Sequence, residues 1–474
     1  MTVSETVHGN HNNPALEFRW GVRTELTRAY TEAAIAELLQ TYPNLDGLMG
    51  AMGESMPGKR STWYRDAVVP GILRAGRQNH PPFILFHWLM PFDDFKEDIA
   101  PPGVYGNTWL AIQHNGEGID SVQVYPTSKR WAEKSGMPTI VQIVPHNVDG
   151  EWYRGVSPQI GSHDSPKLAY EMIDQYRHLK NCVGFNYHAT AGDLNNALFK
   201  KSLGFYATNN VPYSEDPWLD LLQTEFGTRQ AAEHILKAYD LSARIVPEVG
   251  ALAWEPHDLY IFNRLRLPFW FFQEQNTRPK WGYFCTPARE GGLMLLPPRY
   301  YAWTLVRNRS LENHNGSEIG PGHWSQEFFW GHIDFQVLPK THMATVRDMG
   351  RECREEMEAA LPHVTTNQAK ANISLHYMKS HELLTQYYEH KVSAAIHALA
   401  YKFGAGSSDR STALSQANLA VADHEAAINY IITNIDENRN LMRSKWGNEG
   451  LTLTQIKAAE RADRDNIATL FQWP

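Results

Sequence analysis

The sequence predicts an α/β fold, a (β/α) barrel of the TIM type that is followed by a C-terminal α-helical domain. Short apolar runs alternate with amphipathic stretches over residues 17–190, a pattern typical of a parallel sheet with crossover helices. The runs are apolar nearly throughout, as strands covered by helices on both faces are, and this favours a closed barrel over a sandwich. After residue 343 a helical pattern continues with few glycines or prolines, which indicates a helical bundle.

The predicted strands are the apolar, β-branched runs of this alternation. They cover residues 18–24, 45–52, 83–90, 108–115, 139–146 and 182–189. A TIM barrel has eight strands. We therefore expect either that N-terminal strands of the barrel are missing from this chain or that a later segment, such as residues 280–286, completes the ring.

Helices are predicted between most of these strands. Residues 25–41 carry apolar side chains near helical spacing, and residues 62–77 form a second helix. Ser165 followed by Pro166 is typical of an N-cap and a first helical position, so a third helix is expected to begin there. Two amphipathic helices on either side of Gly227 follow the last strand.

Three domains are expected along the chain. Residues 1–255 form the barrel and carry the catalytic groups. Residues 256–342 are rich in proline, glycine and aromatic residues, so we expect long loops that wrap the barrel. Residues 343–474 form the α-helical bundle domain.

Composition and charge exclude several classes of protein. The 474 residues are 42% hydrophobic and 20% charged, with a formal net charge of -8, and no basic block marks a nucleic-acid binder. No run of about 18 apolar residues could cross a bilayer, so no membrane partner is expected. Cys182, Cys285 and Cys353 are widely spaced and suggest neither a disulfide framework nor a cysteine zinc site. The polar N-terminal stretch has no secretory signal.

Carboxylates follow two of the predicted strands at the point where each strand ends. Reactive groups of a parallel barrel lie at the carboxyl ends of its strands. Glu54 follows the second strand in a glycine-rich turn, and Glu117 and Asp120 follow the fourth. Glycoside hydrolysis needs one carboxylic acid that protonates the leaving oxygen and a second carboxylate that acts as base or nucleophile. We predict Glu54 as the acid and leave its partner open between Glu117 and Asp120; a loop carboxylate that caps a turn or binds a sugar hydroxyl is the alternative.

Other polar and aromatic residues near the strand ends are predicted to bind substrate. Aromatic residues make up 12% of the chain, and their flat rings suit stacking on sugars, although core packing is the alternative for each. An arginine near the first strand suits a substrate carboxylate. The predicted substrate-binding residues are Arg23, His87, Trp88, His114, Asn115, Gln142, His146, Trp152, Asn186 and His188.

Four strand-end histidines offer a second hypothesis. His87, His114, His146 and His188 could form a metal site like those of barrel metallohydrolases. No two of them share a short ligand spacing, and a lone histidine in an apolar strand is more often a core residue. We therefore rank the metal site as the second hypothesis.

Five motifs follow one another in an order that a known family shares. They are YPNLDGLMGAMGESMPG, FILFHWLM, NTWLAIQHNGEGID, TIVQIVP and VGFNYHATAGDLNN. Over residues 40–228 this order resembles the α-glucuronidases, glycoside hydrolases that remove glucuronic acid from xylan. The resemblance implies that Glu54, with Pro57 and Gly58 behind it, is the general acid and that Gln142 is retained. It also implies an inverting mechanism that uses no metal and no organic cofactor. It implies further that the chain begins in mid-barrel. His87 stands where the family has an arginine, so the resemblance leaves the substrate open.

We therefore predict a glycoside hydrolase, exo-acting on an acidic or decorated plant or algal polysaccharide or oligosaccharide. The alternatives are a polysaccharide lyase or metal-dependent hydrolase, and a non-catalytic carbohydrate-binding protein. The substrate class suggests a periplasmic or secreted protein, and a homo-oligomer formed through the helical domain is left open. The sugar, the linkage and the stereochemical outcome stay open at this point.

Overall fold

The computed structural model describes the chain as two compact units. The sheet unit comprises Met1–His114, Val124–Ile143 and Gln175–Tyr187, and the helical unit comprises Asn115–Gln123, Val144–Asp174 and His188–Pro474. The residues that the structure describes are 2–3, 25–51, 63–77, 83–87, 107–113, 133, 136–143, 164–179, 181–187, 197–252, 339–402, 407–435, 441–443, 450–452, 457–458, 460–461 and 464–465.

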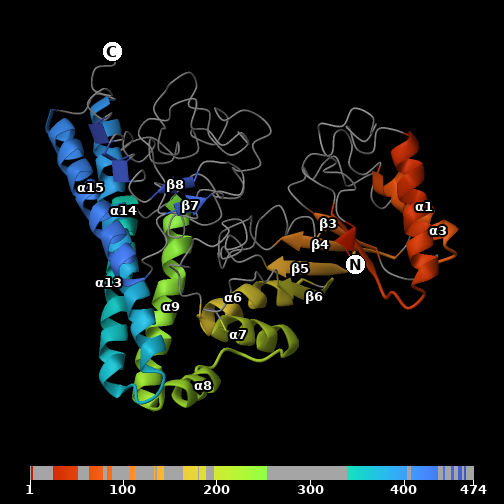
Figure 1. Cartoon of the computed structure of the whole chain (residues 1–474), viewed down its shortest axis with the longest axis horizontal. Coiled ribbons are helices and arrows are strands. Elements are labelled where there is room, and N and C mark those ends of the chain that lie inside the picture. The colour runs from red at the N-terminus through yellow and green to blue at the C-terminus, as the bar shows by residue number, and fades with distance from the viewer. Residues whose placement is uncertain are drawn as a thin grey trace. The chain divides into compact units, whose positions relative to one another are not determined.

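The sheet unit is built on six strands that lie side by side in chain order (Figure 1). They are β1 (Thr2–Val3), β2 (Leu48–Ala51), β3 (Phe83–His87), β4 (Thr108–Gln113), β5 (Thr139–Ile143) and β6 (Cys182–Tyr187). All neighbouring pairs are parallel. Strands β2 to β6 lie within five of the predicted runs, so a parallel sheet is confirmed there, whereas β1 was not predicted. The predicted strands 18–24 and 280–286 lie outside the described residues.

The sequential strand order means that the sheet is wound in one direction. Doubly wound sheets reverse their strand order at a switch point, but here each strand pairs with the next strand of the chain, as in a barrel. Within the described residues, β1 and β6 are the two edges of the sheet, and no further strand joins them. A parallel α/β sheet is therefore confirmed, and a closed TIM barrel is not shown.

Short helices of the sheet unit pack together beside the sheet. Helix α1 (Glu25–Thr41) matches its predicted range, and its buried side chains include Ile35 and Leu39. The predicted helix 62–77 is present as a five-residue π-helix, η2 (Tyr64–Val68), that continues into α3 (Val69–Arg74). Both η2 and α3 pack against α1.

Two helical side chains contact the same face of the sheet. Tyr64 of η2 shares a hydrogen bond with Thr108 of β4. On the same face, the ring of Tyr176 in α6 (Pro166–Arg177) meets that of Phe185 in β6, with centroids 6.2 Å apart. Because successive residues of a strand point to opposite faces, every second residue of β4 to β6 belongs to this face, and the residues between belong to the other one.

The helical unit begins with helices that the local sequence specifies. The backbone N–H of Leu168 donates to Ser165 Oγ at 3.0 Å, so the predicted N-cap of α6 is confirmed. The helices that follow are α7 (Ala197–Thr208), α8 (Asp216–Phe226) and α9 (Arg229–Leu252). Gly227 ends α8 with a φ of 98°, and a Cβ at this position would lie 1.8 Å from Thr365 Oγ1, so glycine is required there.

Long helices follow in the described part of this unit, as the sequence predicted. They are α13 (Pro339–Ala360), which ends in the 3-10 turn η7 (Leu361–His363), α14 (Gln368–Lys402) and α15 (Ser407–Asn434). Helix α13 packs between α9 and α14, and α14 packs against α15 (Figure 1). Gly350 lets α13 approach α14 closely, because a Cβ there would lie 2.2 Å from Thr385 Oγ1. Strands β7 (Leu441–Arg443) and β8 (Gly450–Thr452) form an antiparallel pair.

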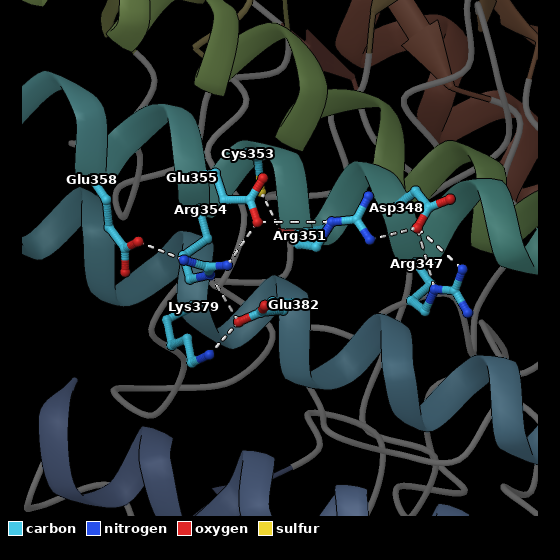
Figure 2. Close-up of polar contacts among 10 residues, drawn as sticks. Arg347, Asp348, Arg351, Cys353, Arg354, Glu355, Glu358, Lys379 and Glu382 are labelled. Atoms are coloured by element: carbon cyan, nitrogen blue, oxygen red, sulfur yellow. Dashed lines mark hydrogen bonds and ion pairs between the residues drawn. The ribbon is translucent and has the colours of Figure 1, made fainter.

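An ion-pair network joins α13 to α14 (Figure 2). Arg354 Nε of α13 lies 3.1 Å from Glu382 Oε2 of α14, and Lys379 binds the same carboxylate from its own helix. The other nitrogens of Arg354 contact Glu358 at 2.5 Å and Glu355 at 3.1 Å. Glu382 is only 5% exposed, so its charge is compensated by two cations where water is largely excluded.

A second buried ion pair connects α14 to the C-terminal segment. Lys391 Nζ and Glu460 Oε1 are 2.7 Å apart, and both side chains are 1% exposed. Tyr387 donates a hydrogen bond of 3.2 Å to the other oxygen of Glu460. Nearby, Arg461 pairs with Glu425 of α15, so the C-terminal segment contacts both helices. No helix in the described part of the chain is both long and apolar enough to cross a membrane.

Candidate functional site

Three amide residues form one row at the carboxyl ends of neighbouring strands. Gln113 of β4 pairs in register with Gln142 of β5, and Gln142 pairs with Asn186 of β6. Gln113 is the last residue of its strand, and the other two stand one residue before the end of theirs. Ligands of parallel α/β folds bind at this end of the strands. This set, called the amide row below, is therefore the candidate site.

Gln142 and Asn186 of the amide row belong to the face of the sheet opposite the one that Tyr64 and Tyr176 contact. Val141 pairs with Ile112 and Phe185, and Phe185 is the residue that contacts α6. Gln142 follows Val141 directly, so it points to the other face. On that face, a Cβ at Gly184 of β6 would meet no atom within 4 Å, which indicates open space beside the row.

Gln142 has an unusual environment for a polar side chain. It is 7% exposed, and its Oε1 is buried without a hydrogen-bond partner. Most buried polar side-chain atoms are hydrogen-bonded, and an unsatisfied one costs roughly 1–3 kcal/mol. Asn186, on the neighbouring strand, is exposed. Trp63 Nε1 is also buried without a partner in the sheet unit, but Trp63 lies outside the amide row.

Two of the predicted binding residues are brought together, and a third lies in a different row. Gln142 and Asn186 are register neighbours. His87 ends β3 and pairs with Ile112, so it occupies the row of Val141. Gln113 was not among the predicted residues, although a glutamine recurs near the ends of TWLAIQ and TIVQI and this recurrence could have indicated it.

The remaining predicted site residues lie outside the described residues. Their positions relative to the strands follow from the numbering: Glu54 comes three residues after the end of β2, and Glu117 comes four residues after the end of β4. Their roles stay predictions. Outside the described residues lie Arg23, Glu54, Trp88, His114, Asn115, Glu117, Asp120, His146, Trp152 and His188.

Two carboxyl groups of the helical unit were not predicted and have raised pKa values. Burial raises the pKa of Asp164 to about 7. The hydrogen bonds that it accepts from the backbone N–H groups of Leu198 at 3.0 Å and Phe199 at 3.3 Å lower this pKa, but burial has the larger effect. Burial also raises the pKa of Asp240 to about 6, although a hydrogen bond donated by Ser165 lowers it. Shifted carboxyl groups are candidates for catalysis, but Asp164 caps the start of α7 and Asp240 holds the N-cap serine of α6. Both therefore have structural roles.

The described residues hold no group of three histidine, cysteine or acidic side chains that could bind a metal ion. This leaves the metal hypothesis untested, since His114, His146 and His188 lie outside the part of the chain that is described. The expectation of a metal-free site stays a prediction.

Comparisons with known proteins relate this chain to a solved structure at the level of the fold. No family model and no curated protein matches the sequence. The structure, however, is similar in fold to a glycoside hydrolase. That solved structure is a GH138 enzyme targeting pectin rhamnogalacturonan II, with a TM-score of 0.66 and 16% sequence identity. The match covers 95% of this chain and 65% of that chain, so this chain spans less than two thirds of the enzyme it resembles.

Proposed function

We propose that this chain is a glycoside hydrolase that acts on a pectic polysaccharide. The observation that carries the proposal is the fold shared, over 95% of this chain, with an enzyme that targets rhamnogalacturonan II. Two features support it. The predicted carboxylates follow the ends of two parallel strands, β2 and β4, and such enzymes hold their reactive groups at this end of their strands. The amide row offers uncharged hydrogen-bonding groups at the same end of the sheet. Pectin is an acidic, decorated plant glycan, the substrate class that the sequence predicts.

We propose Glu54 as the acid that protonates the leaving oxygen, with Glu117 or Asp120 as its partner. Strand β3 lies between β2 and β4. Neighbouring strands are about 4.8 Å apart, so the ends of β2 and β4 are separated by about 10 Å. Carboxyl pairs lie about 6.5–9.5 Å apart in inverting glycosidases and about 5–5.5 Å apart in retaining ones. The wider spacing supports an inverting mechanism, in which the second carboxylate activates a water molecule.

We also propose that the sheet belongs to a (β/α) barrel. Crossovers between parallel strands are almost always right-handed, so a sheet whose strands run in chain order carries all of its crossover helices on one face, which is the winding of a barrel. The domain bounds 1–255, 256–342 and 343–474 and assembly through the helical domain are proposals of the same kind. Limited proteolysis tests the bounds, and light scattering of the purified chain tests the assembly.

Cleavage assays on three substrate classes test the proposed activity. Fragments of rhamnogalacturonan II, glucuronic-acid-substituted xylan and neutral glycosides are incubated with the chain, and the products are separated by chromatography. We expect cleavage of the pectic fragments; release of glucuronic acid from xylan would instead support the α-glucuronidase resemblance. Unsaturated products would identify a lyase, and binding without any cleavage would identify a carbohydrate-binding protein.

Glu54→Gln tests the assignment of the acid. The amide keeps the shape of the side chain but cannot donate the proton, so turnover is expected to fall by roughly 10²- to 10⁴-fold. Glu37→Gln is the matched control, because Glu37 is an exposed residue of α1. Turnover of Glu54→Gln equal to that of the control would remove Glu54 from the mechanism. NMR of the first product formed should show inversion at the anomeric carbon.

A further inference from the structure

The amide row differs in residue type from the row that precedes it on the same face of the sheet. Three neighbouring strands each carry an amide residue at one register position. On the same face, two residues earlier, the corresponding row is Ala111, Ile140 and Gly184. Small and apolar residues therefore give way to amides only at the carboxyl end, where a ligand of a parallel sheet binds.

A ligand that satisfies the buried oxygen of Gln142 must donate a hydrogen bond to it. An amide oxygen accepts hydrogen bonds and cannot donate them. Asn186 beside it is exposed, and the space next to Gly184 is open, so a ligand has room at this end of the sheet. A sugar hydroxyl supplies the donor, whereas an ionised substrate carboxylate has only acceptor atoms and would leave Gln142 Oε1 unsatisfied.

We propose that the amide row is a subsite for the hydroxyl groups of the glycan, in which Gln142 Oε1 accepts a hydrogen bond from a sugar hydroxyl and Asn186 contacts the same sugar. This inference rests on the proposed function, because it takes a sugar as the ligand. It adds that this part of the site recognises uncharged hydroxyl groups, so the acidic group of a pectic substrate lies elsewhere. In the absence of ligand, Gln142 then lowers the stability of the fold.

Binding and stability, measured together on Gln142→Met, test the proposal. Methionine is unbranched and similar in size, and it removes the unsatisfied oxygen. By titration calorimetry with fragments of rhamnogalacturonan II, we expect roughly three- to tenfold weaker binding, the effect of one lost hydrogen bond. The melting temperature is expected to stay the same or rise. Gln40→Met, at an exposed position of α1, is the matched control and should change neither quantity.

The outcomes separate this proposal from the proposed function. Unchanged affinity of Gln142→Met overturns the proposal that the amide row binds the glycan. If the melting temperature also falls, Gln142 has a packing role. If Gln142→Met does not fold, Asn186→Ala at its exposed position decides, and unchanged affinity there overturns the proposal. A wild-type chain that binds the fragments without cleaving them contradicts the proposed hydrolase activity. The affinities of the variants still test the binding role of the amide row. A wild-type chain that binds none of them overturns both.

Discussion

Two buried polar side chains, one in each unit of this chain, differ in whether they have a partner. In the helical unit, Lys391 and Glu460 lie 2.7 Å apart at 1% exposure, and Tyr387 adds a hydrogen bond to the same carboxylate. In the sheet unit, Gln142 Oε1 is buried without a partner. A buried polar group with partners in the chain is satisfied in the folded state. A buried group without partners lowers the stability of the fold, and a ligand that satisfies it would remove this cost. Lys391 and Glu460 therefore have a structural role, and the missing partner of Gln142 Oε1 supports the binding role proposed for it.

Lys391→Met is expected to have the largest effect on stability. It leaves the carboxyl group of Glu460 buried without its cation, and breaking a buried ion pair in this way costs about 3–5 kcal/mol. Burial raises the pKa of Glu460, although the charge of Lys391 lowers it. Without Lys391 the carboxyl group of Glu460 can take up a proton, and this limits the loss of stability. Urea denaturation followed by circular dichroism measures the effect on the helices.

A double variant sharpens this prediction. Lys391→Met with Glu460→Met leaves no buried charge, so most of the lost stability should return. A double variant as unstable as Lys391→Met alone would contradict a loss caused by an uncompensated charge.

The stability of the helical unit is expected to fall as pH rises from 4 to 7. The pKa of Asp164 is about 7 in the folded chain, above its ordinary value of 3.8. A raised pKa in the folded state gives stability that is complete below pH 3.8 and is lost as pH rises through 7. A shift of this size corresponds to on the order of 4 kcal/mol.

Asp164→Asn tests this pH dependence. Asparagine keeps an oxygen that can accept from the N–H groups of Leu198 and Phe199, but it does not ionise. The difference in melting temperature between pH 4.5 and pH 8 should therefore shrink in this variant. Asp46→Asn, at an exposed position, should leave the difference as it is in the wild type. An equal difference in all three proteins would rule out Asp164 as its source.

Two helical glycines offer the smallest and most closely matched comparison. A Cβ at Gly350 would lie 2.2 Å from Thr385 Oγ1 and 3.2 Å from Glu382 Cα, so Gly350→Ala should push α13 away from α14 and cost about 1–3 kcal/mol. A Cβ at Gly204 of α7 would meet no atom within 4 Å, so Gly204→Ala should stabilise by about 0.5–1 kcal/mol. Thermal denaturation of both variants measures the effects, and equal shifts would contradict a close approach at Gly350.

Much of the fold could be predicted because its signals are local. Helix α1 has its predicted bounds, Glu25–Thr41, and Ser165 forms its predicted N-cap, since helical spacing and capping depend on a few adjacent residues. The packing of α9 against α13 could not be predicted in the same way. An amphipathic pattern indicates that a helix packs against a partner, but it does not indicate which element that partner is.

The candidate site shows the same division. Residue types at strand ends singled out Gln142 and Asn186, but their adjacency depends on which residues of β5 and β6 pair, and a shift of one residue would move a side chain to the other face. The pairing also places His87 beside Ile112, in a different row. Glu54 stays a prediction of the sequence, and its test is chemical.

By itself, the sequence determined the parallel strands β2 to β6, the long helices that follow them and the concentration of polar residues at the strand ends, since apolar periodicity and turn chemistry are properties of neighbouring residues. Only the tertiary structure decided that Gln113, Gln142 and Asn186 form one row and that Lys391 finds Glu460. These facts depend on pairing between distant segments, and hydrogen bonding and burial between such segments are settled only when the chain has folded.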